Sequence, residues 1–479
     1  MVFSSIIFIF YFLPAFLLAY YLSGWRTAVL LAGSALFYAW GEGAFLALLG
    51  ALIVANHIGV GVMDRSRGRA RQALLAGIIV TDLAVLGWFK YAGFVGASLN
   101  RLLTDAPFPE ASHHLLLGIS FFTFQLISYA VDIYRRTLPA ERSLVRFATY
   151  VLMFPHLIAG PIVRYAHIAD ELHADRRRSG RIGLGVRYFI VGLCQKVLVA
   201  NAVAPLADFA FGLPADSLDA TTAWLGAVAY TLQIYFDFCG YSNMAIGLAF
   251  MLGFTFPRNF DYPYAAASIT DFWRRWHISL SSWFRDYLYI PLGGNRGGKL
   301  RTLRNLLIVF LLTGLWHGAA WTFVVWGLFH GAFLILERIG LGRLLARAPG
   351  VVRHAYVLIV VIAGWVIFRA QSLAQAGDYL SAMANLRSFQ TPRLELARLA
   401  DIEVIVTLVA GSILSFPVVP ALLQRLRAPR SDAPSPELPQ RLDTRSAHAV
   451  PTPLLLAGLT LSVAVLAGTT LNPFLYFRF

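Results

Sequence analysis

Residues 303–338 of this 479-residue chain read LRNLLIVFLLTGLWHGAAWTFVVWGLFHGAFLILER. Two apolar segments, 303–319 and 321–338, follow each other here with one short turn between them. Each approaches the roughly 20 residues that a helix needs to cross a bilayer. The turn holds His317 in the sequence Gly-Leu-Trp-His-Gly-Ala. The stretch therefore predicts a pair of membrane-spanning helices with an ionisable side chain where they meet.

Similar apolar segments recur along the rest of the chain. Hydrophobic residues make up 58% of it and charged residues 14%, whereas a soluble globular protein carries roughly 25% charged residues. The predicted spans are 3–22, 26–42, 44–62, 73–95, 115–134, 187–205, 223–253, 303–319, 321–338, 354–371, 402–424 and 453–470. We expect an all-α polytopic membrane protein of about 11–12 transmembrane helices. It should form one domain over residues 1–479, with its motifs in 115–340.

Two apolar segments need a separate interpretation. The opening MVFSSIIFIFYFLPAFLLAYYL lacks the basic start and the small-residue cleavage site of a signal peptide, so we interpret it as the first span. Segment 147–163 is interrupted by Pro155, Gly160 and Pro161. Broken backbone at membrane depth has to be sheltered by protein. This segment is therefore predicted to be re-entrant and not to cross.

The charged residues set the expected orientation. The net charge is +15, and the basic residues gather in alternate loops, as they do on the cytoplasmic side of membrane proteins. These loops are 63–72, 135–146, 164–187, 254–302, 338–353 and 425–450. Loop 206–222 holds aspartates and no basic residue. The alternation places both termini outside the cytoplasm and explains the charge without nucleic-acid binding. Residues 426–452, rich in Pro, Ser and Arg, predict a flexible cytoplasmic loop.

His317 is the first candidate functional residue. A helix over 303–316 would be about 20 Å long, short of a hydrocarbon core of about 30 Å, so the turn should lie below the outer surface. Gly314 and Gly318 flank the histidine and are expected to leave space beside its ring. A buried imidazole with space beside it suits a general base, because its pKa lies near neutrality. The alternative is a packed, hydrogen-bonded histidine.

The run 271–287 is the second candidate. Large apolar residues recur in it at helical spacing, at Trp273, Trp276, Leu280, Trp283 and Tyr287. This pattern predicts one amphipathic helix at the membrane interface, with its tryptophans at headgroup depth. Arg274, Arg275 and Arg285 lie off the apolar stripe. They suit the phosphates of an anionic donor such as coenzyme A or a carrier's prosthetic group, although cytoplasmic arginines are expected here in any case.

Other polar residues within the apolar segments admit two interpretations. Gln233, Asp237 and Tyr241 share one helix face, and Gln125, Ser128 and Asp132 share another. Each set could line a polar tunnel or join neighbouring helices. Lys90 and Lys196 are explained by snorkelling or a partner carboxylate, and His330 and Glu337 as packing or lining groups. Cys194 and Cys239 are expected to be buried and reduced, and no ligand spacing predicts a metal site.

Seven blocks of sequence together resemble a known family. They are MVFSS at 1–5, SFFTFQLISYAVDIYR at 120–135, LIAGPIVRY at 157–165, YFDFCGYSNMAIGLAFMLGF at 235–254, DFWRRWHISLSSWFRDYLYIPLGGNRGG at 271–298, GLWHGAAWTFVVWGLFHG at 314–331 and NPFLYFRF at 472–479. The chain resembles the membrane-bound O-acyltransferase (MBOAT) superfamily, and within it the alginate O-acetylation membrane proteins. It is also similar to the proteins that transfer D-alanine for teichoic acid modification.

The resemblance implies a fold and two site residues. The family's catalytic histidine falls on His317 and its second characteristic polar position on His277. The family fold is a ring of tilted helices, with re-entrant and interfacial helices, around a thinned centre and a central tunnel that links the cytoplasm to the outer face. Three positions depart from the usual pattern. Cys239 replaces a serine, Asn243 an aspartate and His156 a glutamine.

The expected activity is transfer of an acetyl group from a thioester to a hydroxyl group for O-acetylation of an exported polysaccharide at a bacterial inner membrane. The donor would be acetyl-coenzyme A or an acyl-carrier thioester, with no metal and no permanently bound cofactor. His317 would act as general base, while His277 positions or polarises the donor or helps the thiolate leave. A periplasmic SGNH-type transferase is the expected partner. The alternatives are peptidoglycan or teichoic acid as acceptor, a transporter, and a non-catalytic scaffold of an export complex.

Overall fold

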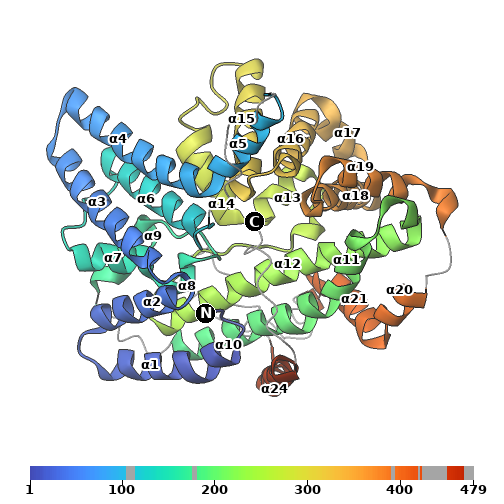
Figure 1. The fold of residues 1–479 in the computed structure, drawn as a ribbon, viewed down its shortest axis with the longest axis horizontal. Helices are drawn as coiled ribbons and strands as arrows, with labels where there is room; N and C mark the ends of the chain where they lie inside the picture. The colour runs from blue at the N-terminus through green and yellow to red at the C-terminus, as the bar shows by residue number, and fades with distance from the viewer. Residues whose placement is uncertain (104–113, 175–180, 390–393, 419–420, 423–449, 469–479) are drawn as a thin grey trace. The chain divides into compact units, whose positions relative to one another are not determined.

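The computed structural model describes residues 1–103, 114–174, 181–389, 394–418, 421–422 and 450–468 (Figure 1). These residues form helices joined by turns and irregular segments, with no strand among them. The chain divides into two compact units. Unit 1 is Met1–Val186 with Met244–Pro257, and unit 2 is Arg187–Asn243 with Arg258–Phe479. Helix α12, Ala220–Met251, runs from unit 2 into unit 1. The predictions of a single domain and of a ring around a tunnel stay predictions.

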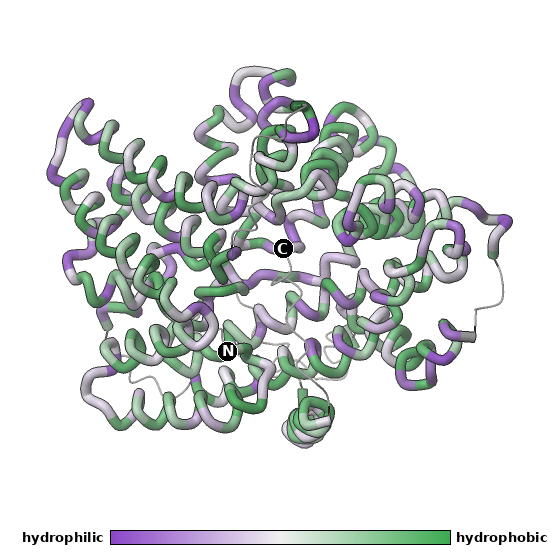
Figure 2. Tube along the Cα trace, in the orientation of Figure 1, coloured by the Kyte–Doolittle hydropathy of each residue, from purple (hydrophilic) through white to green (hydrophobic). Residues whose placement is uncertain are grey.

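The helices have the hydropathy of a membrane protein. By length and composition, five helical stretches of the described chain can cross a membrane: Phe45–Arg65, Gly68–Asn100, Ile182–Gly212, Trp321–Arg347 and Gly350–Arg369. Four shorter apolar helices are Ile7–Leu22, Ile119–Tyr134, Ile402–Leu414 and Thr452–Gly468. Figure 2 shows hydrophobic colour along most of these helices and hydrophilic colour at the turn between α3 (Phe45–Arg65) and α4 (Gly68–Leu86). The protein is an all-helical membrane protein, as the sequence predicts.

Unit 1 is built from helices that are neighbours along the chain. They are η1 (Ile7–Phe12), α1 (Leu13–Leu22), α2 (Arg26–Glu42), α3, α4, η2 (Gly87–Tyr91), α5 (Ala92–Asn100), α6 (Ile119–Tyr134), α7 (Leu144–Leu152), α8 (Phe154–Leu157) and α9 (Tyr165–His173). Helices α3, α4 and α6 pack against one another, and α2 packs against α7 (Figure 1). Phe3, Phe8, Phe37 and Phe154 form an aromatic core with ring centroids 5.0–6.2 Å apart.

The segment 147–163 is broken, as its prolines and glycine predict. Helix α7 ends at Leu152, the single turn α8 follows, and the chain then runs without regular structure to Val163. Every residue from Val151 to Val163 is buried. The Nε2 atom of His156 lies 2.7 Å from the carbonyl oxygen of Tyr150. This irregular backbone is covered by protein, which is the condition for such a segment to lie at membrane depth.

Unit 2 contains the helices that carry the candidate histidines. Its elements are η4 (Gln195–Ala200), α11 (Asn201–Gly212), η5 (Ala215–Ser217), most of α12, η6 (Pro263–Ala265), α13 (Ile269–Arg275), α14 (Ile278–Phe284), η7 (Arg285–Tyr289), α15 (Lys299–His317), α16 (Trp321–Leu336), η8 (Glu337–Leu341), α17 (Gly342–Arg347), α18 (Gly350–Arg369), α19 (Leu373–Ala384), η9 (Leu386–Ser388), α20 (Leu394–Leu399), α21 (Ile402–Leu414) and α24 (Thr452–Gly468). Helix α10 (Ile182–Cys194) begins in unit 1 and continues into unit 2. Helices α15 and α16 pack along each other, and α16 packs against α18.

Several predicted boundaries agree with the structure and two do not. The predicted spans 26–42 and 321–338 correspond to α2 and to α16 with the start of η8. The helix before His317 begins at Lys299, so its 19 residues extend about 28 Å, and the expectation of a helix of about 20 Å is wrong. Its first turns carry basic residues, which hid them from the hydropathy pattern. The predicted loop 426–452, apart from its last three residues, and the block 472–479 lie outside the described residues.

The prediction of one continuous helix over 271–287 is also wrong. Helix α13 ends at Arg275 and α14 begins at Ile278, and His277 between them has left-handed backbone angles, φ 43° and ψ 57°. Trp273, Trp276 and Trp283 are buried within the protein, so they do not form an exposed stripe that faces lipid. Trp276 packs against Phe272, Phe260 and Trp365 with ring centroids 4.7–5.7 Å apart. These aromatic contacts hold the tryptophan inside unit 2, and the interfacial placement of the segment stays a prediction.

Candidate active site

His277 occupies the break between α13 and α14. A left-handed conformation at a residue other than glycine costs about 1–2 kcal/mol, so surrounding contacts have to hold it. The backbone N–H of Ile278 donates to the carbonyl oxygen of Asn259 at 2.9 Å. The His277 side chain is fully buried, with Phe238 edge-on at a centroid distance of 4.7 Å. The break thus directs one imidazole into the interior of unit 2.

The hydrogen bonds of His277 define its tautomer. Its Nδ1 atom lies 3.1 Å from the Oδ1 atom of Asn259, and the amide nitrogen of Asn259 donates to Ser242 at 3.0 Å. The Ser279 hydroxyl also donates to Asn259 Oδ1, at 2.8 Å. This oxygen is therefore an acceptor, and Nδ1 carries the proton. Burial lowers the pKa of His277 to about 3, so the ring is neutral at pH 7. Its Nε2 atom offers a buried lone pair with no partner among the described residues.

His317 is the last residue of α15 and lies in an aromatic enclosure. Its side chain is 4% exposed. Three rings stand edge-on to the imidazole, those of Trp316 and Trp326 at 4.9 Å and that of Phe368 at 5.3 Å. The enclosure comes from the end of α15, from α16 and from α18. Such surroundings exclude bulk water from the imidazole, which strengthens electrostatic interactions at the site.

The structure brings both predicted histidines against the same indole. The His277 ring lies 5.9 Å from the ring of Trp316, and Trp316 lies 4.9 Å from His317. Trp316 is the residue immediately before His317, so the end of α15 contributes both a base candidate and the ring that contacts the second histidine. The sequence pattern did not indicate this role of Trp316, nor the role of Asn259, which lies 18 residues before His277.

The expectation that Gly314 and Gly318 leave space beside His317 is wrong. A Cβ atom at Gly314 would lie 2.2 Å from the carbonyl oxygen of Phe323, and one at Gly318 would lie 2.1 Å from the Phe323 ring. The start of α16 fills the positions that these glycines leave open. The glycines therefore allow close contact between the two helices, as small residues do in membrane proteins, and they fix the position of the histidine between them.

His330 and Glu337 support the site from α16 and η8. The His330 ring is fully buried among Phe272, Trp273 and Trp326, and neither of its nitrogens has a partner within the described part of the chain. The Glu337 carboxylate accepts from the backbone N–H groups of Ile269 and Thr270 at 2.6 and 2.9 Å. It also accepts from the Thr270 hydroxyl at 2.5 Å. Glu337 thereby holds the start of α13, in agreement with its prediction as a packing or lining group.

The three predicted donor-binding arginines have different surroundings. Arg275 pairs with Asp271 at 3.0 Å, and Arg285 pairs with the neighbouring Asp286 at 2.7 Å. Arg274 lies instead on the wall of a cavity of about 510 Å³ within unit 2. We call it the arginine cavity. It is lined by Ala267, Ser268, Thr270, Asp271, Arg274, Leu306, Leu334, Glu337, Arg338, Gly342, Leu345, Ala346 and Arg353. Arg338 and Arg353 were not singled out by the sequence, although they belong to the basic segment 338–353.

The polar stripe on α12 joins helices. The Lys196 ammonium lies 2.5 Å from the carboxylate of Asp237, and both side chains are almost completely buried. Asn243 donates to the side-chain oxygen of Gln195 at 2.7 Å and contacts the sulfur of Cys239. The Lys196–Asp237 and Gln195–Asn243 pairs connect η4 to α12, and the pair at Asp237 favours the packing interpretation of this stripe. Cys194 and Cys239 are both free thiols.

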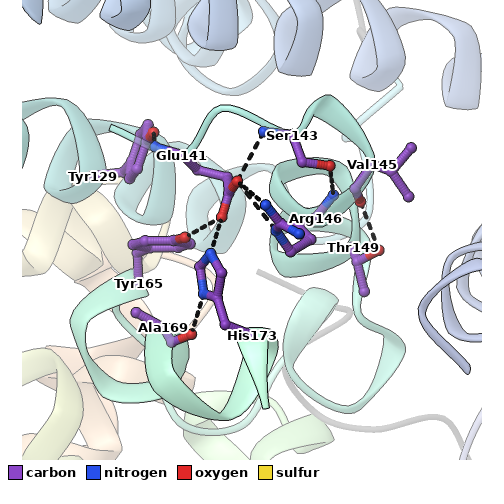
Figure 3. Close-up of polar contacts among 9 residues, drawn as sticks. All are labelled: Tyr129, Glu141, Ser143, Val145, Arg146, Thr149, Tyr165, Ala169 and His173. Carbon is purple, nitrogen blue, oxygen red and sulfur yellow. Dashed lines mark hydrogen bonds and ion pairs between the residues drawn. The ribbon is translucent and has the colours of Figure 1, made fainter. Parts of the chain in front are cut away.

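Unit 1 has a polar cluster of its own, around Glu141 (Figure 3). One carboxylate oxygen accepts from the Ser143 N–H at 2.8 Å and from the Arg146 guanidinium at 3.0 Å. The other accepts from the Tyr165 hydroxyl at 2.8 Å and meets His173 Nε2 at 2.9 Å. Burial by itself raises the pKa of Glu141, but the hydrogen bonds from these donors outweigh it and leave the pKa below its usual value. The cluster ties the α6–α7 loop to α9.

Comparisons with known proteins identify the family of this chain. The family model of membrane-bound O-acyltransferases, MBOAT, matches residues 135–375. The chain is 41% identical to the "Probable alginate O-acetylase AlgI" of Azotobacter vinelandii over the whole of both chains. It is 36% identical to the "Peptidoglycan O-acetyltransferase" of Helicobacter pylori, over 81% of this chain and 80% of the relative. It is 29% identical to the "Teichoic acid D-alanyltransferase" of Bacillus subtilis, over 54% of this chain and 71% of the relative.

Proposed function

Because this chain belongs to the membrane-bound O-acyltransferase family, we propose that it transfers an acetyl group from a cytoplasmic thioester toward an exported, alginate-like polysaccharide. The enzyme class follows from the family. The observation that supports this chemistry is the pair of buried histidines that contact Trp316, one of which offers an unpartnered Nε2 lone pair. The donor in this proposal is acetyl-coenzyme A or an acyl-carrier thioester, used as a substrate.

His317 is the general base in this mechanism. The acceptor hydroxyl gives its proton to the imidazole while its oxygen attacks the thioester carbonyl carbon. The tetrahedral intermediate then collapses, the C–S bond breaks, and the imidazolium returns the proton to the leaving sulfur. The products are an acetyl ester and a free thiol, and the histidine is neutral again. The aromatic enclosure around His317 contributes a dry site and a fixed geometry.

His277 has a more restricted role than a general acid. A neutral ring with its proton on Nδ1 can accept a hydrogen bond at Nε2 and cannot donate one there. It is therefore suited to orient an N–H or O–H group of the donor or acceptor. It is not suited to polarise the thioester carbonyl or to protonate the thiolate. This assignment narrows the three roles that the sequence left open for His277.

In this proposal the acetyl donor and the acceptor lie on opposite sides of the membrane. Activated acetyl groups arise in the cytoplasm, whereas an exported polymer is modified on the outer face. A site that both faces reach would pass the acetyl group outward and leave the thiol carrier inside. In this proposal the protein lies in a bacterial inner membrane, and the immediate acceptor is the polysaccharide or a serine on a periplasmic SGNH-type transferase that completes the modification.

Two other functions remain distinct candidates. Peptidoglycan acetylation is favoured by the 36% identity to the Helicobacter pylori relative over most of both chains. Transfer of D-alanine has weaker support, because that match covers 54% of this chain. Purified protein separates these functions when labelled acetyl-coenzyme A or a labelled D-alanyl carrier thioester is offered together with alginate, peptidoglycan or teichoic acid in parallel reactions. A transporter or scaffold would form no ester with any of these polymers, nor on the serine of an added SGNH-type transferase.

The direct test is replacement of the base. His317→Ala should lower the transfer rate by about 10²–10⁴-fold, the usual contribution of a general base, without loss of folded protein. Acetyl transfer is measured with the protein in lipid nanodiscs and in cells by polymer acetyl content. His114→Ala is the matched control, because this histidine is 58% exposed and belongs to unit 1. Normal transfer by His317→Ala at a normal protein level would reject the mechanism.

A further inference from the structure

We propose that the arginine cavity is the phosphate-binding subsite for the acyl donor, with Arg274, Arg338 and Arg353 as its anion-binding side chains. The proposal rests on the proposed function, because it concerns the substrate of that reaction. It differs from the sequence prediction, which assigned this role to Arg274, Arg275 and Arg285. The present proposal replaces the last two, which pair with Asp271 and Asp286, by two arginines from the segment after α16.

The carboxylates that line the cavity are already engaged. Both oxygens of Glu337 accept hydrogen bonds from the start of α13, and Tyr356 donates to one of them at 3.2 Å. Asp271 pairs with Arg275 at 3.0 Å. Neither acid therefore needs one of the three cavity arginines as its partner. The cavity has an excess of positive charge that the protein leaves available.

The three arginines are not neutralised from within the described part of the chain. None of them has a carboxylate within salt-bridge distance there. Arg338 donates to the neutral side-chain oxygen of Asn295 at 2.9 Å. The Nε atom of Arg353 is buried and has no hydrogen-bond partner. A buried N–H group that stays unpaired costs about 1–3 kcal/mol, so an acceptor supplied by a ligand is the simplest account of its position.

The chemistry of the walls fits a phosphate ester attached to a larger molecule. Guanidinium groups bind phosphate oxygens through two parallel hydrogen bonds, and three arginines line this one cavity. Its volume of about 510 Å³ lies within the range of small-molecule sites, about 300–1,000 Å³. Leu306, Leu334 and Leu345 add an apolar wall for the uncharged part of such a ligand.

The position of the cavity relative to His317 fits a thioester donor of this kind. Arg274 lies on the cavity, while the preceding residue, Trp273, contacts the ring of Trp326 at 5.7 Å. Trp326 in turn contacts His317 at 4.9 Å. A coenzyme A thioester carries its phosphates at the far end of a flexible pantetheine arm from the sulfur. The phosphate subsite is thus set apart from the base, which agrees with the length of the pantetheine arm between the phosphates and the sulfur.

The experiment compares donors with and without phosphate. Arg274→Gln, Arg338→Gln and Arg353→Gln should each raise the KM for acetyl-coenzyme A about tenfold with little change in kcat, and Arg353→Lys should restore part of the loss. Kinetics with acetyl-pantetheine, which has no phosphate, should stay unchanged in all of them. Arg343→Gln is the matched control, because this exposed arginine on α17 does not line the cavity. Equal effects on both donors, or no effect on either, would overturn the proposal.

A binding measurement separates this proposal from the proposed function. Coenzyme A should bind His317→Ala protein with the affinity of the wild type, and Arg353→Gln should weaken that binding about tenfold even where no transfer is seen. Unchanged coenzyme A binding in all three arginine variants would reject the subsite while leaving the acetyltransferase proposal intact. An anionic lipid headgroup is the rival phosphate source. If nanodiscs of phosphatidylglycerol and phosphatidylcholine distinguish the variants while coenzyme A binding does not, the cavity is a lipid site and the donor proposal is wrong.

Discussion

The Glu141 cluster of unit 1 and the histidine site of unit 2 treat buried polar groups in opposite ways. Glu141 accepts from Ser143, Arg146 and Tyr165 and meets His173, so both carboxylate oxygens are satisfied. His277 is also buried, but its Nε2 atom has no hydrogen-bond partner in the described chain. Neither ring nitrogen of His330 has a partner there. Leaving a buried polar atom unpaired costs about 1–3 kcal/mol. The comparison indicates that the first region is there for stability and the second for a ligand.

The largest expected difference between the two regions is in acetyl-transfer activity. It is tested by removing the Nε2 lone pair of His277. Asparagine tolerates a left-handed backbone and places an amide near the position of Nδ1, so His277→Asn should keep the contact with Asn259 and remove only Nε2. We expect its kcat/KM for acetyl transfer to fall about 10–100-fold, which corresponds to about 1.4–2.7 kcal/mol. His277→Gln, which reaches the position of Nε2 with an acceptor oxygen, should lose less.

The matching change in unit 1 should leave activity intact. Glu141→Gln is expected to retain the wild-type kcat/KM within about twofold, because Glu141 belongs to the structural cluster. Full activity of His277→Asn would make that histidine structural as well. A large loss of kcat/KM in folded Glu141→Gln protein would show that the fully satisfied cluster also serves the reaction. Either result would end the distinction between the two regions.

Stability should show the reverse order. Glu141→Gln replaces an acceptor by an amide nitrogen and leaves donors from Arg146 or Tyr165 unpaired, so the protein should lose about 1–3 kcal/mol of unfolding free energy. Chemical denaturation in detergent measures this loss. The matched control is Asp170→Asn on α9, because Asp170 is exposed and surface changes of this kind stay within about 0.5 kcal/mol. An equal loss in both variants would show that the cluster contributes nothing specific.

The smallest expected effect is the pH dependence that His277 adds to stability. Its pKa falls from an ordinary value of 6.5 to about 3 on folding, so the unfolded chain binds the proton more readily. The resulting stability is complete above about pH 6.5 and is lost as the pH falls from there toward 3. Between pH 7 and pH 5.5 the loss should be about 1 kcal/mol.

The same titration of His277→Asn isolates this contribution. The difference in unfolding free energy between wild type and variant should shrink on acidification between pH 7 and pH 5.5. Glu141 affects stability in a different pH range. Because its pKa is lowered on folding, its ionised carboxylate stabilises the fold above about pH 4.5, the ordinary pKa of a glutamate. This stabilisation is lost only as the pH falls below that value. Parallel curves for wild type and His277→Asn would mean that the imidazole does not stay neutral in the folded protein.

Hydropathy and charge predicted the fold class and most helices, because those patterns are local. Hydropathy predicts the spans 26–42 and 321–338, and Pro155, Gly160 and Pro161 predict the break in 147–163. The start of α15 was missed because Lys299 and Arg301 look like a loop when only hydrophobicity is considered.

The break at His277 had no comparable signal. Residues 271–287 contain no proline or glycine, and their tryptophans keep helical spacing. The residue at the break, His277, contacts Asn259, which lies 18 residues away in the sequence. In the same way, the arginine cavity depends on how segments around α13, α15, α16 and α18 meet. A role for Arg353 in the cavity can be recognised only once those segments are placed in space, because no local sequence pattern predicts how they pack.

Helix α13 has seven residues, and this brevity limits how the enzyme can be re-engineered. Arg274 on the cavity and His277 at the reactive site lie three positions apart, on either side of the end of α13. A rigid displacement of α13 would therefore shift donor affinity and turnover together. If the cavity binds the donor as proposed, attempts to change the preferred thioester should leave α13 alone and vary Arg338, Arg353 and Leu345, which line the cavity from other elements.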